Sequence, residues 1–254
     1  MIGRIEEDYA AISQAAARYV YDRIVEREHT VLGLATGDTP LGLYRELLRL
    51  HEKRPIRPEQ LTTFNLDEYV GEAPDSPHSY RYYMNQHLFL PLGIPLAQTY
   101  VPDGCAAHIA AECGRYEARM EACGGVDLQI LGVGQNGHIG FNEPGTSFAS
   151  RTHEVVLSSS TRRANAKHFG SEARVPRRAI TMGIASILRA KEILLLASGR
   201  QKADAMRHLF EGTVTNEWPV TVLRRHPEVY VLMDQEAASL LSGATLESVI
   251  SYSP

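Results

Sequence analysis

The stretch VLGLATGDTP, residues 31–40, decides the fold. Its first half is a short, continuous apolar run, which predicts a β-strand buried on both faces of a sheet. The glycine turn that follows, and Pro40 in a position that suits the first turn of a helix, predict a strand, a tight turn and a helix in succession. This is the unit from which parallel sheets are built.

The same pattern recurs along the chain. Further core strands are predicted at 61–66, 127–133, 191–198 and 228–234, and helices at 5–26, 107–122, 160–169, 200–211 and 235–242. This alternation predicts the α/β class, with a mostly parallel sheet and helices on both of its faces. In such sheets ligands bind beyond the carboxyl ends of the strands, so the loops there are the candidate site.

Composition limits the possible functions. The 254 residues are 44% hydrophobic and 22% charged, which fits a globular chain with a large core, and we expect one domain over 1–254. A net charge of −4 gives no positive field for nucleic acid or membrane surfaces. Three cysteines without a CxxC pair, and an N-terminus without an apolar core, predict reduced thiols in the cytosol.

Two strand-to-helix junctions are candidate anion sites. In ATGDTP, residues 35–40, backbone N–H groups and the helix dipole can cradle a phosphate, although a plain turn has the same composition. In SGRQKADA, residues 198–205, Lys202 falls in the first helical turn, where it opposes the dipole unless an anion is bound. A solvated surface lysine is the alternative.

The segment NLDEY, residues 65–69, puts Asp67 and Glu68 directly after an apolar strand. Partial loss of solvent at the mouth of a sheet raises the pKa of a carboxyl group, and this suits a general base. An Asx turn or a helix cap would use the same residues.

The segment LGVGQNGHIGFNEPG, residues 131–145, carries the densest signal. Its first three glycines satisfy the spacing of a dinucleotide-binding motif, but the later glycines and Pro144 break the helix that such a motif needs. We expect instead a loop that bends around a ligand and exposes His138, Asn142 and Glu143 for proton transfer. A histidine satisfied within the core is the alternative.

The stretch 143–183 is polar and rich in arginine. It is compatible with a mobile lid over the site or with a solvated surface excursion.

The ten histidines are scattered, and neither an HExxH motif nor a cysteine cluster is present, so no metal is expected. The sequence also lacks the GxSxG motif of serine hydrolases.

Taken together, ATGDTP, TTFNLDEYVG, LGVGQNGHIGFNEPG, ASRTH, VPRRAITMGI and SGRQKA resemble the glucosamine-6-phosphate deaminases in order and spacing, from about residue 30 to the strand near 233. The resemblance implies a Rossmann-like three-layer α/β sandwich. It also implies that glucosamine 6-phosphate and water are converted to fructose 6-phosphate and ammonia, without a cofactor or a metal.

The resemblance further implies a role for each matching residue. Asp67 would move a proton between C2 and C1, His138 would assist opening of the pyranose ring, and Glu143 would orient that imidazole. Asn136 stands where many members carry Asp. The phosphate would be held by Thr36, Gly37, Asp38, Thr39, Lys167 and Lys202, with Asp38 in place of a small residue common in the family.

Two other functions remain open at this point. A 6-phosphogluconolactonase-like hydrolase has a related fold and a similar glycine and histidine loop, but it needs no base at C2. A non-catalytic sugar-phosphate effector domain normally follows a helix-turn-helix, and only about 30 residues precede the first predicted strand.

We expect a monomer or a small homo-oligomer. The allosteric members bind an effector between subunits through basic residues that are replaced here by His153 and Val155, so weak or absent activation is expected.

Overall fold

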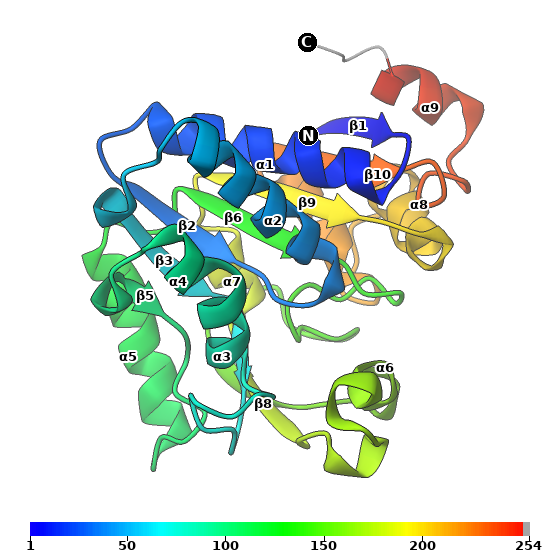
Figure 1. Cartoon of the computed structure of the whole chain (residues 1–254). Helices are drawn as coiled ribbons and strands as arrows, with labels where there is room; N and C mark the ends of the chain where they lie inside the picture. The colour runs from blue at the N-terminus through cyan, green and yellow to red at the C-terminus, as the bar shows by residue number, and fades with distance from the viewer. Residues whose placement is uncertain (251–254) are drawn as a thin grey trace.

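The chain folds into two sheets with helices packed around the larger one (Figure 1). The structure is a computed structural model that describes residues 1–250. The strands are β1 (Ile2–Glu6), β2 (Thr30–Leu34), β3 (Leu61–Asn65), β4 (Asp67–Tyr69), β5 (Thr99–Tyr100), β6 (Leu128–Gly132), β7 (His153–Val156), β8 (Arg178–Thr181), β9 (Glu192–Ala197) and β10 (Val229–Asp234). The helices are α1 (Tyr9–Val25), α2 (Asp38–Lys53), α3 (Tyr80–Met84), α4 (Leu90–Leu92), α5 (Ile109–Ala122), α6 (Ser159–Phe169), α7 (Ile184–Ile187), α8 (Ala203–Glu211) and α9 (Gly243–Ile250).

The larger sheet has seven parallel strands in the order β1-β10-β9-β6-β2-β3-β5. From β2 the chain adds β3 and β5 on one side, and it then returns to add β6, β9 and β10 on the other. The direction of winding therefore reverses between β2 and β6. In open parallel sheets this reversal opens a crevice at the carboxyl ends of the two strands.

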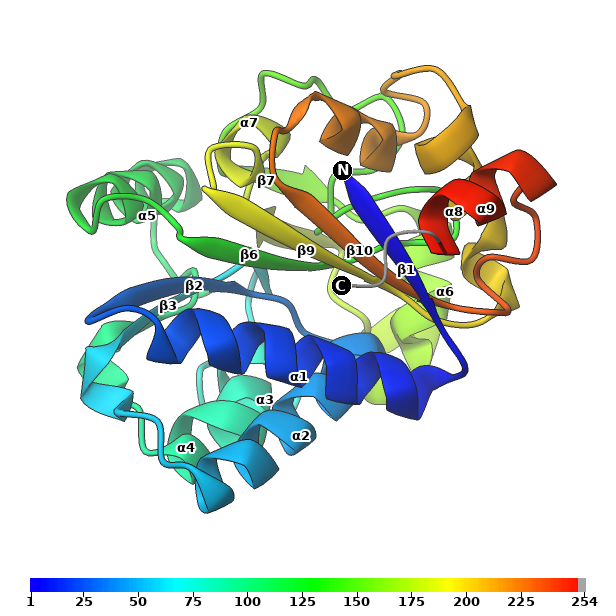
Figure 2. The same cartoon turned by 90° about the horizontal axis from the view of Figure 1, so that it is seen from above.

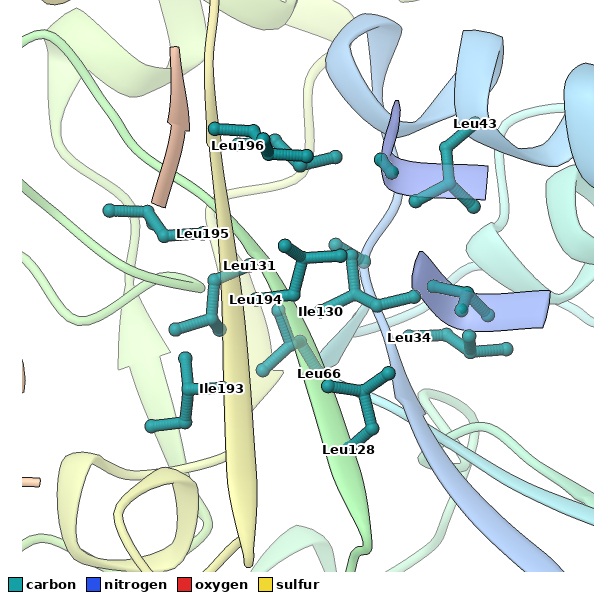
Figure 3. Close-up of a cluster of buried hydrophobic side chains, with 14 of the residues drawn as sticks. Leu34, Leu43, Leu66, Leu128, Ile130, Leu131, Ile193, Leu194, Leu195 and Leu196 are labelled. Carbon is teal, nitrogen blue, oxygen red and sulfur yellow. The ribbon is translucent and has the colours of Figure 1, made fainter. Parts of the chain in front are cut away.

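Helices cover both faces of the seven-stranded sheet, with α1 and α2 on one side and α5 and α7 on the other (Figure 2). Successive side chains of β9 point to opposite faces, so Ile193 and Leu195 pack on one side and Leu194 and Leu196 on the other (Figure 3). All four are essentially inaccessible to solvent. Burial on both faces is the reason that these strands are continuous apolar runs in the sequence.

The smaller sheet is antiparallel, in the order β4-β8-β7, and it lies with α6 below the seven-stranded sheet in Figure 1. It forms because β4 follows β3 after a single residue and pairs with β8, which is more than 100 residues further along the chain. Segment 143–183 supplies β7, α6 and β8.

The predicted fold class is confirmed, and the predicted core strands agree with β2, β3, β6, β9 and β10 to within two residues at either end. The helix predicted at 5–26 corresponds to α1 but begins too early, and the helix predicted at 235–242 is wrong. Residues 5 and 6 belong to β1, which pairs with β10, so the first strand begins at residue 2 and α1 starts after the Asp8 cap. Residues 235–242 form turns held by Asp234, whose carboxylate accepts from the Ala237 N–H at 2.8 Å, and the last helix follows at α9.

No helix within residues 1–250 combines the length and the apolar character needed to cross a membrane.

Candidate active site

A cavity of about 1130 Å³ opens at the crevice between β2 and β6. The loops after β2, β3, β6 and β9 line it, and α6 contributes a further wall. Gly37 and Glu143 do not line the cavity. Gly37 lies between Thr36 and Asp38 in the sequence, and both of these line it. Glu143 accepts a hydrogen bond from Asn136, which also lines it. The predicted site residues that line the cavity are Thr36, Asp38, Thr39, Asp67, Asn136, His138, Lys167 and Lys202.

Asp67 is the first residue of β4 and is 6% exposed. Within residues 1–250 no group donates a hydrogen bond to its carboxylate, although the carboxylate borders the cavity. Burial, with a smaller contribution from the charge of Glu68, raises the pKa of Asp67 to about 8. A Cβ built on Gly140 would lie 3.8 Å from Asp67 Oδ2, so the loop that carries His138 passes beside this carboxylate.

Glu68 lies in a different environment. Its carboxylate accepts hydrogen bonds from the backbone N–H groups of Tyr69 at 2.8 Å, Tyr80 at 2.9 Å and Arg81 at 2.9 Å. Burial raises the pKa of Glu68 to about 7, and these hydrogen bonds oppose the rise. Glu68 therefore caps the start of α3, as one of the alternatives for NLDEY predicted, whereas the described part of the chain offers the Asp67 carboxylate no hydrogen-bond donor.

His138 is held through Asn136 by Glu143. The Asn136 amide nitrogen donates to Glu143 Oε2 at 2.8 Å, and the amide oxygen lies 2.8 Å from His138 Nδ1. Glu143 Oε1 in turn accepts from Ser158 Oγ at 3.0 Å and from Thr161 Oγ1, both at the start of α6. The chain of contacts therefore runs from α6 to the imidazole.

This chain of contacts determines which ring nitrogen carries the proton. A carboxylate only accepts hydrogen bonds, so Glu143 requires the NH₂ end of the Asn136 amide to face it. The amide oxygen then faces His138 Nδ1, and this nitrogen must be the one that bears hydrogen. The other nitrogen, Nε2, keeps its lone pair in the neutral ring.

The electrostatics favour that neutral ring. Burial lowers the pKa of His138, the charge of Glu143 raises it, and Lys202 lowers it further, so that the net change is downward. The pKa of Glu143 is also lowered; burial opposes this change, but the Thr161 hydrogen bond and the histidine outweigh it. Near neutral pH the pair is therefore an uncharged imidazole and a carboxylate.

Room for the imidazole depends on a glycine. A Cβ added at Gly134 would lie 2.2 Å from the His138 ring, closer than any real contact, whereas a Cβ at Gly132 would meet nothing within 4 Å.

The expected exposure of Asn142 is wrong. This side chain is fully buried and donates to the carbonyl oxygens of Ile139 at 2.8 Å and Met182 at 2.9 Å, which anchors the loop to the end of β8.

The opposite end of the cavity is cationic. Gly37 has a φ of 102°, which permits the sharp turn before α2, and its carbonyl accepts from the Tyr83 hydroxyl at 2.7 Å. Lys202 is half-buried, and burial followed by repulsion from Lys167 lowers its pKa. Lys167 reaches across from α6 and donates to the Asp38 carboxylate.

Several lining residues were not predicted from the sequence. Tyr80 lines the cavity, and its hydroxyl donates to that of Tyr69 at 3.1 Å. Thr161 and Arg163 enter the lining from α6. None of these residues belongs to a recognisable sequence motif. Thr161 and Glu143 are 18 positions apart in the sequence, and only the folding of the chain brings them into contact. No three His, Cys, Asp or Glu side chains in residues 1–250 are grouped to hold a metal ion.

Residues 6–231 match the family described as glucosamine-6-phosphate isomerases/6-phosphogluconolactonase. The chain belongs to this family. Among its relatives is a glucosamine-6-phosphate deaminase of Geobacillus sp. (strain WCH70), which is 54% identical over 92% of this chain and 93% of its own length.

Solved structures of family members are also similar. A structure described as a monomeric glucosamine-6-phosphate deaminase is 49% identical, with a TM-score of 0.93, over 94% of this chain and all of its own length. The 6-phosphogluconolactonase of Leishmania guyanensis has a TM-score of 0.76 at 22% identity, over 95% of this chain and 99% of its own, so that it shares the fold.

Proposed function

We propose that this chain is a glucosamine-6-phosphate deaminase, which converts glucosamine 6-phosphate and water to fructose 6-phosphate and ammonia. The observation that carries the proposal is the carboxylate of Asp67, which has no hydrogen-bond donor among residues 1–250, in a cavity that also holds the His138 imidazole and two lysines. The 54% identity to a relative of that name supports the same function.

Asp67 is proposed as the base that takes the proton from C2 and returns it to C1. A carboxylate without hydrogen-bond donors keeps its lone pairs available, and a pKa of about 8 makes it a far stronger base than an ordinary carboxylate. Together with loss of a proton from the amino group and gain of one by the oxygen on C1, this transfer turns the open-chain 2-amino aldose into a 2-imino sugar. Water then adds to C2 and ammonia leaves, which gives the ketose. A lactonase would have no use for a base at this position.

His138 is proposed to open the pyranose ring. With Nδ1 bonded to Asn136, the lone pair of Nε2 can accept the proton of the anomeric hydroxyl and return it to the ring oxygen. Asn136 and Glu143 act by fixing the tautomer and the direction of the imidazole.

The phosphate is proposed to bind at the cationic end of the cavity. The turn formed by Thr36, Gly37, Asp38 and Thr39 offers backbone N–H groups at the N-terminus of α2. Lys167 and Lys202 supply two positive charges, which suit a group whose charge is near −2 at neutral pH.

The wider context is also proposed. Segment 143–183 acts as a lid, because α6 both lines the cavity and contacts Glu143. The chain works as one α/β domain over 1–254, and as a monomer, in common with the description of the 49%-identical structure. The three free cysteines fit a cytoplasmic protein.

The test is to incubate the purified, metal-stripped protein with glucosamine 6-phosphate and to follow ammonia and ketose phosphate together. We expect equal amounts of both products. Hydrolysis of 6-phosphogluconolactone without ammonia release would assign the chain to the lactonase branch of the family. Saturable binding of the sugar phosphate with no product would indicate an effector domain.

A further inference from the structure

The cation that reaches the phosphate end from α6 already has an anionic partner within the protein. Lys167 Nζ donates to Asp38 Oδ2, and the two residues belong to elements 129 positions apart. Both side chains line the cavity. More than half of each side chain is exposed, so the pair is accessible from the cavity and is not locked in the core.

The carboxylate of Asp38 meets the same groups that a phosphate would meet. It lies in the first turn of α2, where negative charge is favoured by the helix dipole, and it takes the hydrogen bond of Lys167. That hydrogen bond is the main cause that holds the pKa of Asp38 below its ordinary value, so the group is anionic at neutral pH. His168, beside Lys167, acts in the same direction.

A charge count shows the consequence. Lys167 and Lys202 contribute two positive charges to this end of the cavity, and Asp38 removes one of them. These three side chains therefore present a net charge of +1 to a phosphate dianion, where the two lysines alone would present +2. The phosphate also has to share Lys167 with the carboxylate of Asp38, which lies in the first turn of α2.

We propose that Asp38 is an internal competitor for the substrate's phosphate, and that it lowers the affinity of the site because its carboxylate must give up Lys167 before a phosphate can bind there. Asp38 is then a residue that sets substrate affinity, in contrast to the phosphate ligand that the family resemblance implies. The inference rests on the proposed function only in taking a phosphate as the ligand.

The size of the effect follows from the charges. A charge of −1 and a charge of −2 about 5 Å apart in a water-like medium repel each other enough to change a dissociation constant by on the order of tenfold. Replacing Asp38 by Asn removes the repulsion and frees Lys167. Repulsion alone then gives a gain of about tenfold, and the release of Lys167 adds to it, so we expect Asp38→Asn to tighten phosphate binding by more than this factor when Lys167 is present.

The experiment measures the dissociation constant of inorganic phosphate by titration calorimetry for the full chain and its variants. The matched control is Glu46→Gln, which removes a carboxylate from the same helix and breaks its ion pair with Arg49 outside the cavity. We expect tighter binding of phosphate in Asp38→Asn and a change of less than about twofold in the control.

A double-variant cycle separates competition from simple repulsion. In a Lys167→Met background the pair is absent, so Asp38→Asn should then tighten phosphate binding by a clearly smaller factor. An equal factor in both backgrounds would overturn competition for Lys167. Weaker or unchanged binding in Asp38→Asn alone would also overturn the proposal.

The phosphate titration does not depend on turnover. If the wild-type chain releases no ammonia from glucosamine 6-phosphate, the proposed function fails while the titration still decides the role of Asp38. If the chain is active, the KM for glucosamine 6-phosphate should fall in Asp38→Asn in parallel with the dissociation constant for phosphate.

Discussion

Replacing Asp67 by Asn should make the protein more stable while it removes most of the activity. The carboxyl group has an ordinary pKa of 3.8 and a pKa of about 8 in the folded chain, mainly because it is buried. An amide of nearly the same shape carries no charge at any pH in this range. The variant therefore isolates the cost of keeping an ionisable group at this position.

The magnitude follows from the two pKa values. Between them the unfolded chain is ionised and the folded chain is protonated, so unfolding releases a proton and stability falls as the pH rises. At about 1.4 kcal/mol for each pH unit, the loss is on the order of 4 kcal/mol at pH 7 and on the order of 6 kcal/mol once the pH has passed about 8. The stability contribution is fully present below about pH 4 and is lost across this window.

The assay is urea unfolding of the wild type and Asp67→Asn at about pH 5 and about pH 9, with Asp75→Asn as the control because Asp75 is an exposed carboxylate in the segment that follows. The free-energy difference between Asp67→Asn and the wild type should grow by at least about 2 kcal/mol from the lower to the higher pH. The control should show no such growth.

The same variant should lose about 10²- to 10⁴-fold in kcat for ammonia release, since it lacks the proposed base. Parallel stability curves for the wild type and Asp67→Asn would refute the burial argument. Near-normal turnover would refute the assignment of the base.

Two further predictions concern the imidazole. Asn136→Asp puts a carboxylate beside His138 Nδ1, so the imidazole, whose protonation removes the Nε2 lone pair, should take up its proton about one pH unit higher, and an unchanged titration of this ring followed by NMR would contradict the proposed contact. Gly134→Ala should displace the ring and lower kcat/KM for glucosamine 6-phosphate by about 10²-fold, whereas Gly132→Ala, with open space around the new methyl group, should cost little; equal effects of the two in steady-state kinetics would refute the steric argument.

The sequence predicted the parts of the fold that depend on local pattern. A strand such as β9 is buried on both faces, so all of its residues after Glu192 are apolar and the run is visible without a structure. The edge strand β1 was missed because its single partner is β10, at the far end of the chain. The small sheet was missed for the same reason, since its β4 has three residues and pairs with a distant strand.

The candidate site divides in a similar way. Asp67 and His138 could be predicted because each follows a core strand, and parallel strands bring such positions to one edge. Tyr80 and Arg163 could not, because they reach the cavity from α3 and α6, whose positions depend on tertiary packing. The ion pair of Lys167 with Asp38 was also beyond prediction, since nothing in either motif refers to the other.

The helix α6 connects the two ends of the cavity mechanically. Its first residues hold Glu143, which orients the imidazole through an amide, and its last turn carries Lys167. A shift of one end of this helix would therefore move contacts at both ends of the cavity. Binding energy from the sugar's phosphate can thus be used to orient the His138 imidazole, which opens the ring. A sugar without that tail would lose speed of reaction as well as affinity, even at saturating concentration.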